Sequence, residues 1–198
     1  MFFFYWFLLS LVELTLSIVA VVLSPILALP FLSTDKKSDW CRVPEGRETL
    51  RGWLHLFSTW DDGIDAGWFD GHYDTRMPTW TSPAKAREGS VFERWKLRMA
   101  WIVRNSCYGF AYYFFSFDRT GGAETRVVAQ HGQWDSASTN YEILTQTNLA
   151  GKKAFLVRGQ FYIRGAWYIR VQIGWKLTWD TPKAQLATHI NPLRVWKS

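Results

Sequence analysis

Cysteine is scarce in this chain, and the common catalytic signatures are absent. Cys41 and Cys107 are its only cysteines among 198 residues, and no CxxC or Cys/His spacing surrounds either of them. A secreted disulfide framework normally needs more, so we expect two free thiols in a reducing compartment, with a single bridge as the alternative. The chain also lacks G-x-S-x-G, H-E-x-x-H and a Gly-rich phosphate loop, so no common hydrolase or nucleotide-binding motif is present.

Charge is almost missing from the first 32 residues, where Glu13 is the only charged side chain. About 30 apolar residues at 1.5 Å per residue exceed the roughly 30 Å hydrocarbon core of a bilayer. Residues 1–32 are therefore predicted to be a transmembrane anchor, whose helix is kinked or ended by Pro25 and Pro30. We expect Glu13 to lie near one interface, with the span at 14–32. A cleaved signal peptide is the alternative, but a basic n-region is missing.

Basic residues follow this apolar run, and none precedes it. They are Lys36, Lys37, Arg42, Arg47 and Arg51. The positive-inside rule then places the N-terminus outside and residues 33–198 in the cytoplasm. Aromatic and basic side chains near the anchor are expected at the membrane interface, because such groups prefer the headgroup level. These are Trp6, Lys36, Lys37, Trp53 and Trp60.

The rest of the chain is predicted to form one soluble α+β domain. Residues 33–49 are polar and form a linker to a domain at 50–198. Helical spacing of apolar residues predicts amphipathic helices at about 50–59 and 91–104, the second capped by Ser90 and Glu93. The apolar segment 108–117 is compatible with a strand, a continuing helix or a re-entrant membrane segment. Antiparallel strands forming a meander are expected over about 124–191, including 125–130 and 186–190.

A long hairpin is the clearest part of this sheet. Apolar residues occupy odd positions from Phe155 to Ile163 and from Trp167 to Trp179, interrupted only at Gly159. If that face is buried, a three-residue turn pairs Ile163 with Trp167, Phe161 with Ile169 and Gly159 with Val171. The opposite face then carries cationic residues that are candidates for binding an anion or a partner. They are Arg158, Arg164, Arg170 and Lys176.

Five aspartates, three glycines and a histidine crowd into residues 60–74, with no Lys or Arg. Asx side chains and glycines are what tight turns require, which is the favoured interpretation. An EF-hand fails at three positions. Asp70, His72 and Asp74 alternate and, with Asp65, could coordinate a divalent cation. This metal site is the alternative; otherwise no cofactor is expected.

The net charge of the whole chain is +6. Leaving out the five aspartates of residues 61–74 reduces the acidic residues to 12, against 23 basic ones. The expected partner of this cationic chain is an anionic lipid bilayer rather than nucleic acid, since an anchor precedes the basic region.

The order of several short motifs resembles a family of small membrane proteins of unknown function encoded by tailed bacteriophages. They are Trp60 with Asp65-Ala66-Gly67-Trp68 and His72, Arg104-Asn105-Ser106-Cys107-Tyr108-Gly109-Phe110, Gly174-Trp175-Lys176-Leu177, and Ile190-Asn191-Pro192. The resemblance implies a viral origin, a location in the host inner membrane or the virion, and an accessory role. It transfers no catalytic residue.

Together these observations predict a single-pass, non-enzymatic membrane protein with a structural or interaction role, and a phage or host protein as partner. One alternative is a membrane-bound, metal-dependent hydrolase that uses the acidic stretch. Another is an ejection-type virion protein that contacts DNA through the cationic face of the hairpin. The oligomeric state does not follow from the sequence.

Overall fold

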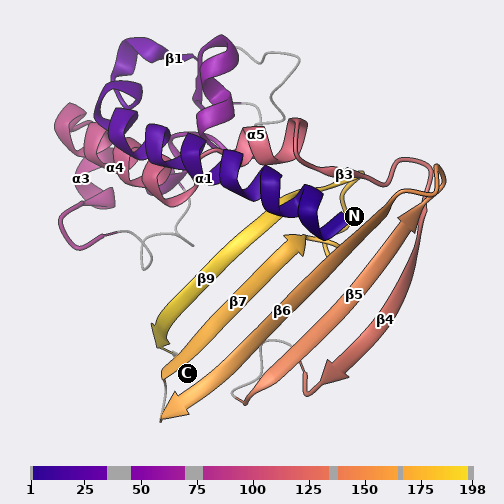
Figure 1. Cartoon of the computed structure of the whole chain (residues 1–198). Helices are drawn as coiled ribbons and strands as arrows, with labels where there is room; N and C mark the ends of the chain where they lie inside the picture. The colour runs from indigo at the N-terminus through magenta and orange to yellow at the C-terminus, as the bar shows by residue number, and fades with distance from the viewer. Residues whose placement is uncertain (1, 35–45, 70–77, 134–137, 165–166, 196–198) are drawn as a thin grey trace. The chain divides into compact units, whose positions relative to one another are not determined.

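The computed structural model describes residues 2–34, 46–69, 78–133, 138–164 and 167–195 (Figure 1). It confirms the predicted α+β class, with a long apolar N-terminal helix and a five-stranded antiparallel sheet. The chain divides into two compact units. Unit 1 comprises Met1–Ser10 and Ala111–Ser198, and unit 2 comprises Leu11–Phe110. The predicted anchor at 1–32 contributes residues to both units.

The helical elements are α1 (Phe2–Leu27), α2 (Ala66–Phe69), α3 (Pro83–Arg87), α4 (Val91–Arg104), α5 (Tyr108–Tyr113) and the 3₁₀ helices η1 (Pro30–Leu32) and η2 (Gly52–Phe57). The strands are β1 (Ser33–Thr34), β2 (Thr49–Leu50), β3 (Phe117–Asp118), β4 (Ala123–His131), β5 (Asn140–Asn148), β6 (Lys153–Arg164), β7 (Trp167–Trp175), β8 (Lys183–Ala184) and β9 (Leu186–Val195).

Helix α1 is continuous through Glu13 and ends at Leu27, between the two prolines that were expected to kink or stop it. Pro30 begins η1, where its fixed φ suits the first helical position. Among the described residues α1 alone is long and apolar enough to cross a membrane. The predicted helix is therefore present, and its length and composition fit an anchor or a signal sequence.

In unit 2, the best sequence prediction is helix α4. Its bounds agree with the expected 91–104, and the Ser90 Oγ accepts a hydrogen bond from the Glu93 N–H at 3.3 Å. The expected return bond differs, because the Glu93 carboxylate accepts from the Ser82 N–H, at the N-cap of α3. The buried face of α4 includes Arg98, which pairs with Glu48.

Two segments of unit 2 differ from the predicted secondary structure. The helix expected at 50–59 is the shorter 3₁₀ helix η2, and Leu50 instead lies in β2. The two ends of the expected linker 33–49 pair with each other, since β1 and β2 form a two-stranded antiparallel sheet. The apolar residues of α4 are not all covered, since Phe92 and Val103 are exposed.

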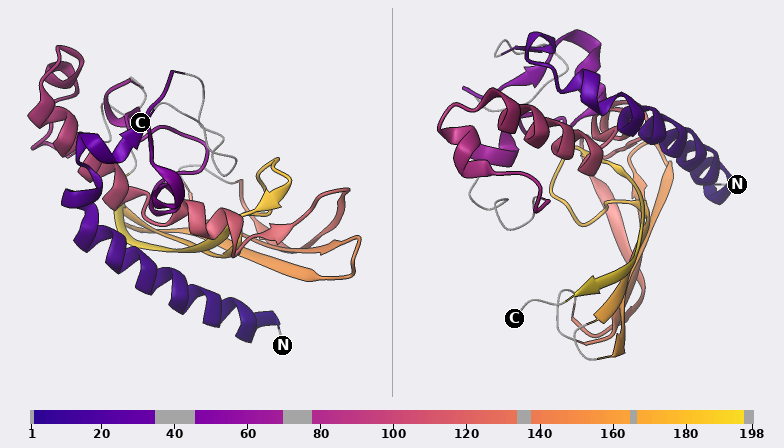
Figure 2. Two further views of the ribbon diagram at one scale, coloured as in Figure 1. Left: turned by 90° about the horizontal axis from the view of Figure 1, so that it is seen from above. Right: turned by 90° about the vertical axis from the view of Figure 1, so that its left-hand side faces the viewer.

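Unit 1 is built on the five-stranded sheet, in the order β4-β5-β6-β7-β9. All neighbours are antiparallel, which confirms the meander, and the right-hand view of Figure 2 shows the sheet as a single twisted layer. The expected strands 125–130 and 186–190 lie within β4 and β9, whereas β5 was not predicted. The segment 108–117 is neither one strand nor one helix, because α5 is followed by the first residue of β3.

The hairpin of β6 and β7 follows the predicted register over most of its length. Phe161 faces Ile169 and Gly159 faces Val171, as expected. The pairing of Ile163 with Trp167 is wrong, because the register shifts after Tyr162 and places Arg164 opposite Trp167. An added residue on one strand of an antiparallel pair produces such a shift.

The apolar face of this hairpin is buried at one end only. Phe155 and Trp175 are buried, whereas Phe161, Ile163 and Trp167 are 42%, 59% and 48% exposed. On the opposite face, Gln160 and Tyr168 are buried, so this face is not the uniformly solvated surface that period two suggested. Alternation therefore predicted which residues share a face but not which part of each face is covered.

Candidate functional site

The described part of the acidic stretch forms a turn. The Asp62 Oδ1 accepts a hydrogen bond from the Gly63 N–H at 2.8 Å, and the Thr59 hydroxyl donates to the Asp62 carbonyl at 2.7 Å. The Ala66 N–H then donates to the Gly63 carbonyl at 3.2 Å, where α2 begins. These contacts are what short Asx side chains and glycine provide in turns, which supports the turn interpretation for residues 59–69.

Asp65 is completely buried in unit 2. Its Oδ2 accepts from the Glu48 N–H at 3.2 Å, and the Glu48 carbonyl accepts from the Ile64 N–H at 2.8 Å. Burial raises the pKa of the Asp65 carboxyl, while the Glu48 N–H and the charge of Arg47 oppose that shift. Asp65 therefore fastens the turn to the chain just before β2.

Charged side chains surround this buried carboxyl. Arg98 pairs with Glu48 and lies over the Trp68 ring, with 5.6 Å between the guanidinium carbon and the ring centroid. The Arg47 Nη2 lies 3.6 Å from the Asp62 Oδ1. Among these groups Arg98 is buried, and its pairing with Glu48 offsets the cost of removing its charge from water.

The predicted metal ligands Asp70, His72 and Asp74 lie outside the described residues. Within the described ranges, no three His, Cys, Asp or Glu side chains are grouped so that they could hold a metal ion. Asp65 is buried and bound to backbone, as described above. The metal site thus stays a prediction.

The residues expected at the membrane interface differ in environment. Trp53 is exposed, whereas Trp60 is buried within unit 2. Trp6 is half-buried in unit 1, where its ring packs edge-on against Phe155 with 5.7 Å between centroids. Lys36 and Lys37 lie outside the described residues. Of the described set, Trp53 has the most exposed ring, and the interface role of these residues stays a prediction.

Arg158 and Lys176, two cationic residues of the hairpin, make contacts within unit 1. The Arg158 Nε donates to the Glu142 Oε2 at 2.6 Å, across the β5–β6 pair. Lys176 is buried, and its Nζ lies 3.0 Å from the Gln185 Oε1 and 4.3 Å from the Trp179 ring centroid. Arg170 is half-exposed, and the side chain of Arg164 is outside the description. Anion binding by this face stays a prediction.

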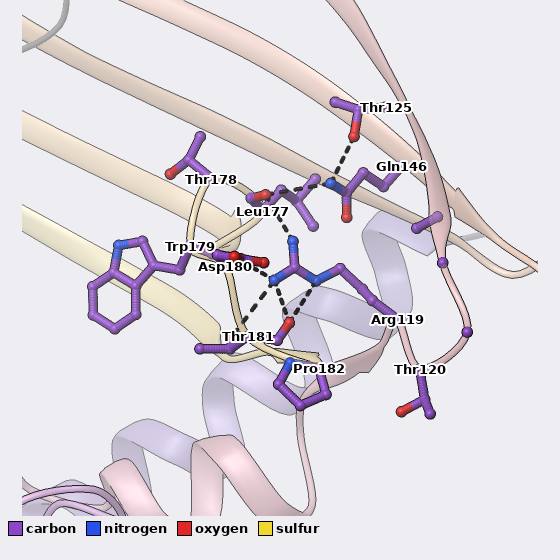
Figure 3. Close-up of a pocket in the computed structure, with 13 residues that line it drawn as sticks. Arg119, Thr120, Thr125, Gln146, Leu177, Thr178, Trp179, Asp180, Thr181 and Pro182 are labelled. Carbon is purple, nitrogen blue, oxygen red and sulfur yellow. Dashed lines mark hydrogen bonds between the residues drawn. The ribbon is translucent and has the colours of Figure 1, made fainter.

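A pocket of about 580 Å³ in unit 1 was not predicted (Figure 3). Its centre is Arg119, whose guanidinium donates to the carbonyls of Leu177, Trp179 and Thr181 in the loop after β7. Burial lowers the pKa of this arginine. Because its donors are directed at backbone carbonyls, Arg119 secures the loop and is poorly available to an anionic ligand.

Gln146 forms the other wall of the pocket. Its Nε2 donates to the Thr125 hydroxyl at 2.8 Å and to the Leu177 carbonyl at 3.3 Å. Its Oε1 is buried and has no hydrogen-bond partner among the described residues. The pocket can thus offer one buried acceptor to a ligand.

The most extensive unusual surface is on α1. Every exposed residue of the helix within the described range is uncharged, and all except Thr15 are apolar or aromatic. The most exposed of them are Val22 at 69% and Phe4 at 66%. Contiguous apolar surface of this extent marks a site of contact with lipid or another protein.

Comparison with known protein families gives a match that covers both units. Residues 1–198 match the family of unknown function DUF7338. The chain belongs to the DUF7338 family. No curated protein and no solved structure matches this DUF7338 chain. Membership in the DUF7338 family shows no phage origin and assigns no activity to the chain.

Proposed function

We propose that this DUF7338 protein is a non-enzymatic membrane protein, held at a bilayer by α1, with a structural or interaction role. The observation that carries the proposal is the uncharged, apolar exposed face of α1. Leaving apolar surface in water costs about 25 cal/mol per Å², so a bilayer stabilises this face. The 25 residues from Phe3 to Leu27 provide ample length for anchoring.

The interaction role rests on the two compact units, each of which has its own hydrophobic core. Asp65 and Arg119, whose pKa values are shifted, hold a turn and a loop in place, which is the structural use of such groups. The flanking basic residues favour placing residues 33–198 on the cytoplasmic side of the membrane.

The resemblance to tailed-phage membrane proteins extends the proposal. On that basis the protein is an accessory component of such a phage and acts at the host inner membrane or in the virion. Mass spectrometry of purified virions tests this extension. Peptides of this chain in virions at a fixed stoichiometry would support packaging, whereas their absence would leave the membrane of the infected cell as its place of action.

Flotation tests the anchoring itself. Full-length protein reconstituted with liposomes should rise with the lipid fraction, and sodium carbonate should not extract it. Protein that stays at the bottom of the gradient would contradict the proposal. Protease added to intact spheroplasts should spare residues 33–198, and cleavage there would overturn the cytoplasmic placement.

A further inference from the structure

Most polar side chains of α1, with the exception of Tyr5 and Thr15, lie on the side of the helix that protein covers. In unit 1, the Ser10 Oγ lies 2.9 Å from the Thr188 Oγ1 in β9. In unit 2, Ser17 forms a side-chain hydrogen bond with the Cys107 thiol, and Ser24 is buried with its hydroxyl donating to the Val21 carbonyl at 2.8 Å. Glu13 is also buried. The helix is therefore more polar on its covered side than on its exposed side.

The covered positions recur every seven residues along α1. They are Trp6, Glu13, Ala20 and Leu27, then Leu9, Leu16 and Leu23, then Ser10, Ser17 and Ser24. A seven-residue repeat marks one continuous stripe on a helix. Trp6 and Leu9 pack on the core of unit 1. Leu16, Ala20 and Leu23 belong to the core of unit 2, which covers the longer part of the helix.

The centre of the opposite face is apolar along the whole helix. It consists of Phe4, Leu8, Leu11, Thr15, Ile18, Val22 and Ile26, all exposed. Thr15 is the one polar member, and its hydroxyl donates to the Leu11 carbonyl at 2.9 Å. That local bond satisfies the hydroxyl donor, so the residue is compatible with a hydrocarbon environment.

A crossing helix would carry its covering protein into the hydrocarbon. In the C-terminal half of α1, Ala20 packs in one cluster with Ile102 and Cys107, and these two residues flank the exposed Arg104 in the chain. Near the start of α1 the cover is Phe155 in β6, two residues after the exposed Lys153. Charged side chains placed at bilayer depth are costly. Among the described residues, no second helix qualifies to shield them as a membrane span.

We propose that α1 lies in the plane of the membrane, with its Ser/Leu stripe on the protein and its opposite face sunk into one leaflet of the bilayer. The inference rests on the proposed membrane anchoring and replaces a spanning helix with an in-plane helix. The N-terminus would then stay on the same side as residues 33–198, unlike the topology expected from flanking charge. The exposed Arg51 after the helix, together with Lys36 and Lys37 in the sequence, suits anionic headgroups on that side.

Spin labels on full-length protein test the orientation. Single cysteines replace Phe4, Thr15 or Ile26 in a Cys41→Ser background, while the native Cys107 is buried and its raised pKa of about 12 keeps it unreactive. The labelled protein is reconstituted into vesicles of phosphatidylcholine with phosphatidylglycerol. The depth of each label is measured from its relative exposure to oxygen and to a water-soluble nickel complex. A label at Leu149, 79% exposed in the turn after β5, is the aqueous control.

An in-plane helix predicts that the three labels lie at the same shallow depth, within about 5 Å of one another. A crossing helix predicts that the Thr15 label lies about 15 Å deeper than the Phe4 and Ile26 labels, and this result would overturn the inference while preserving membrane anchoring. If the protein does not float with the vesicles and all labels report water, both the inference and the proposed function fail.

Discussion

The Ser10 Oγ lies 2.9 Å from the Thr188 Oγ1, although 178 positions separate the two residues in the chain. This hydrogen bond joins the first turns of α1 to strand β9 within unit 1. It shows that the part of the apolar helix that belongs to unit 1, up to Ser10, is packed against the sheet of that unit.

The Ser10–Thr188 contact should be energetically coupled. We expect Ser10→Ala and Thr188→Val each to lower the free energy of unfolding in detergent, with a coupling of about 1 kcal/mol in the double mutant. Thr15→Ala is the matched control, because the Thr15 hydroxyl donates to the Leu11 carbonyl within its own helix. Denaturant titration of the four proteins measures the coupling. A coupling no larger than the one between Thr15→Ala and Thr188→Val would show that the Ser10–Thr188 hydrogen bond contributes nothing.

Charge on the exposed face of α1 should weaken membrane binding. Val22→Lys places a charge at the most exposed apolar position of the helix. The cost at full depth, about 2.5–3.5 kcal/mol, corresponds to at least a tenfold loss in liposome partitioning. Leu149→Lys, in the exposed turn after β5, should leave partitioning unchanged. Equal flotation of the two variants would contradict the proposal that the exposed face of α1 contacts lipid.

Gly174 in β7 should resist replacement. Its φ is 104°, and a Cβ there would collide with the Phe155 carbonyl oxygen. We expect Gly174→Ala to destabilise the protein by about 1–3 kcal/mol more than Gly151→Ala. Gly151 also has positive φ, but nothing lies within 4 Å of its added Cβ, so it isolates the collision from the backbone strain. Thermal unfolding of the two variants gives the comparison. Equal losses of stability would mean that β6 moves away from the added Cβ at no measurable cost in free energy.

The buried Asp65 should make stability depend on pH. Because burial raises the folded-state pKa of its carboxyl above the ordinary value of 3.8, the folded protein binds the proton more tightly than the unfolded chain does. The stabilisation is therefore complete below about pH 3.8 and is lost as the pH rises through the folded pKa. Unfolding titrations from pH 3.5 to 7 should show wild type losing stability relative to Asp65→Asn. A constant difference between the two proteins would contradict the raised pKa.

Local sequence signals predicted the elements that depend on neighbours along the chain. The Ser90 cap and the apolar spacing gave the bounds of α4, and alternation gave the paired faces of β6 and β7. Strand β5 was missed because its Asn, Thr and Gln residues interrupt the apolar alternation. Its place in the sheet comes from pairing with β4 and β6.

The candidate sites were less predictable. The turn at residues 59–69 followed from its Asp and Gly content, but the burial of Asp65 depends on Glu48, 17 positions earlier. The pocket around Arg119 depends on carbonyls about 60 positions away. No covered face of α1 was predicted, although the seven-residue spacing of Ser10, Ser17 and Ser24 is a signal in the sequence that could have indicated it.

By itself, the sequence determined that residues 1–32 contain an apolar helix whose only charged residue is Glu13, since helix formation and hydropathy depend on neighbouring residues. Only the tertiary structure decided which side of that helix is covered. The reason is physical: a helix face becomes a protein face or a lipid face according to what packs on it, and Thr188 and Cys107 approach the serine stripe only after the chain has folded.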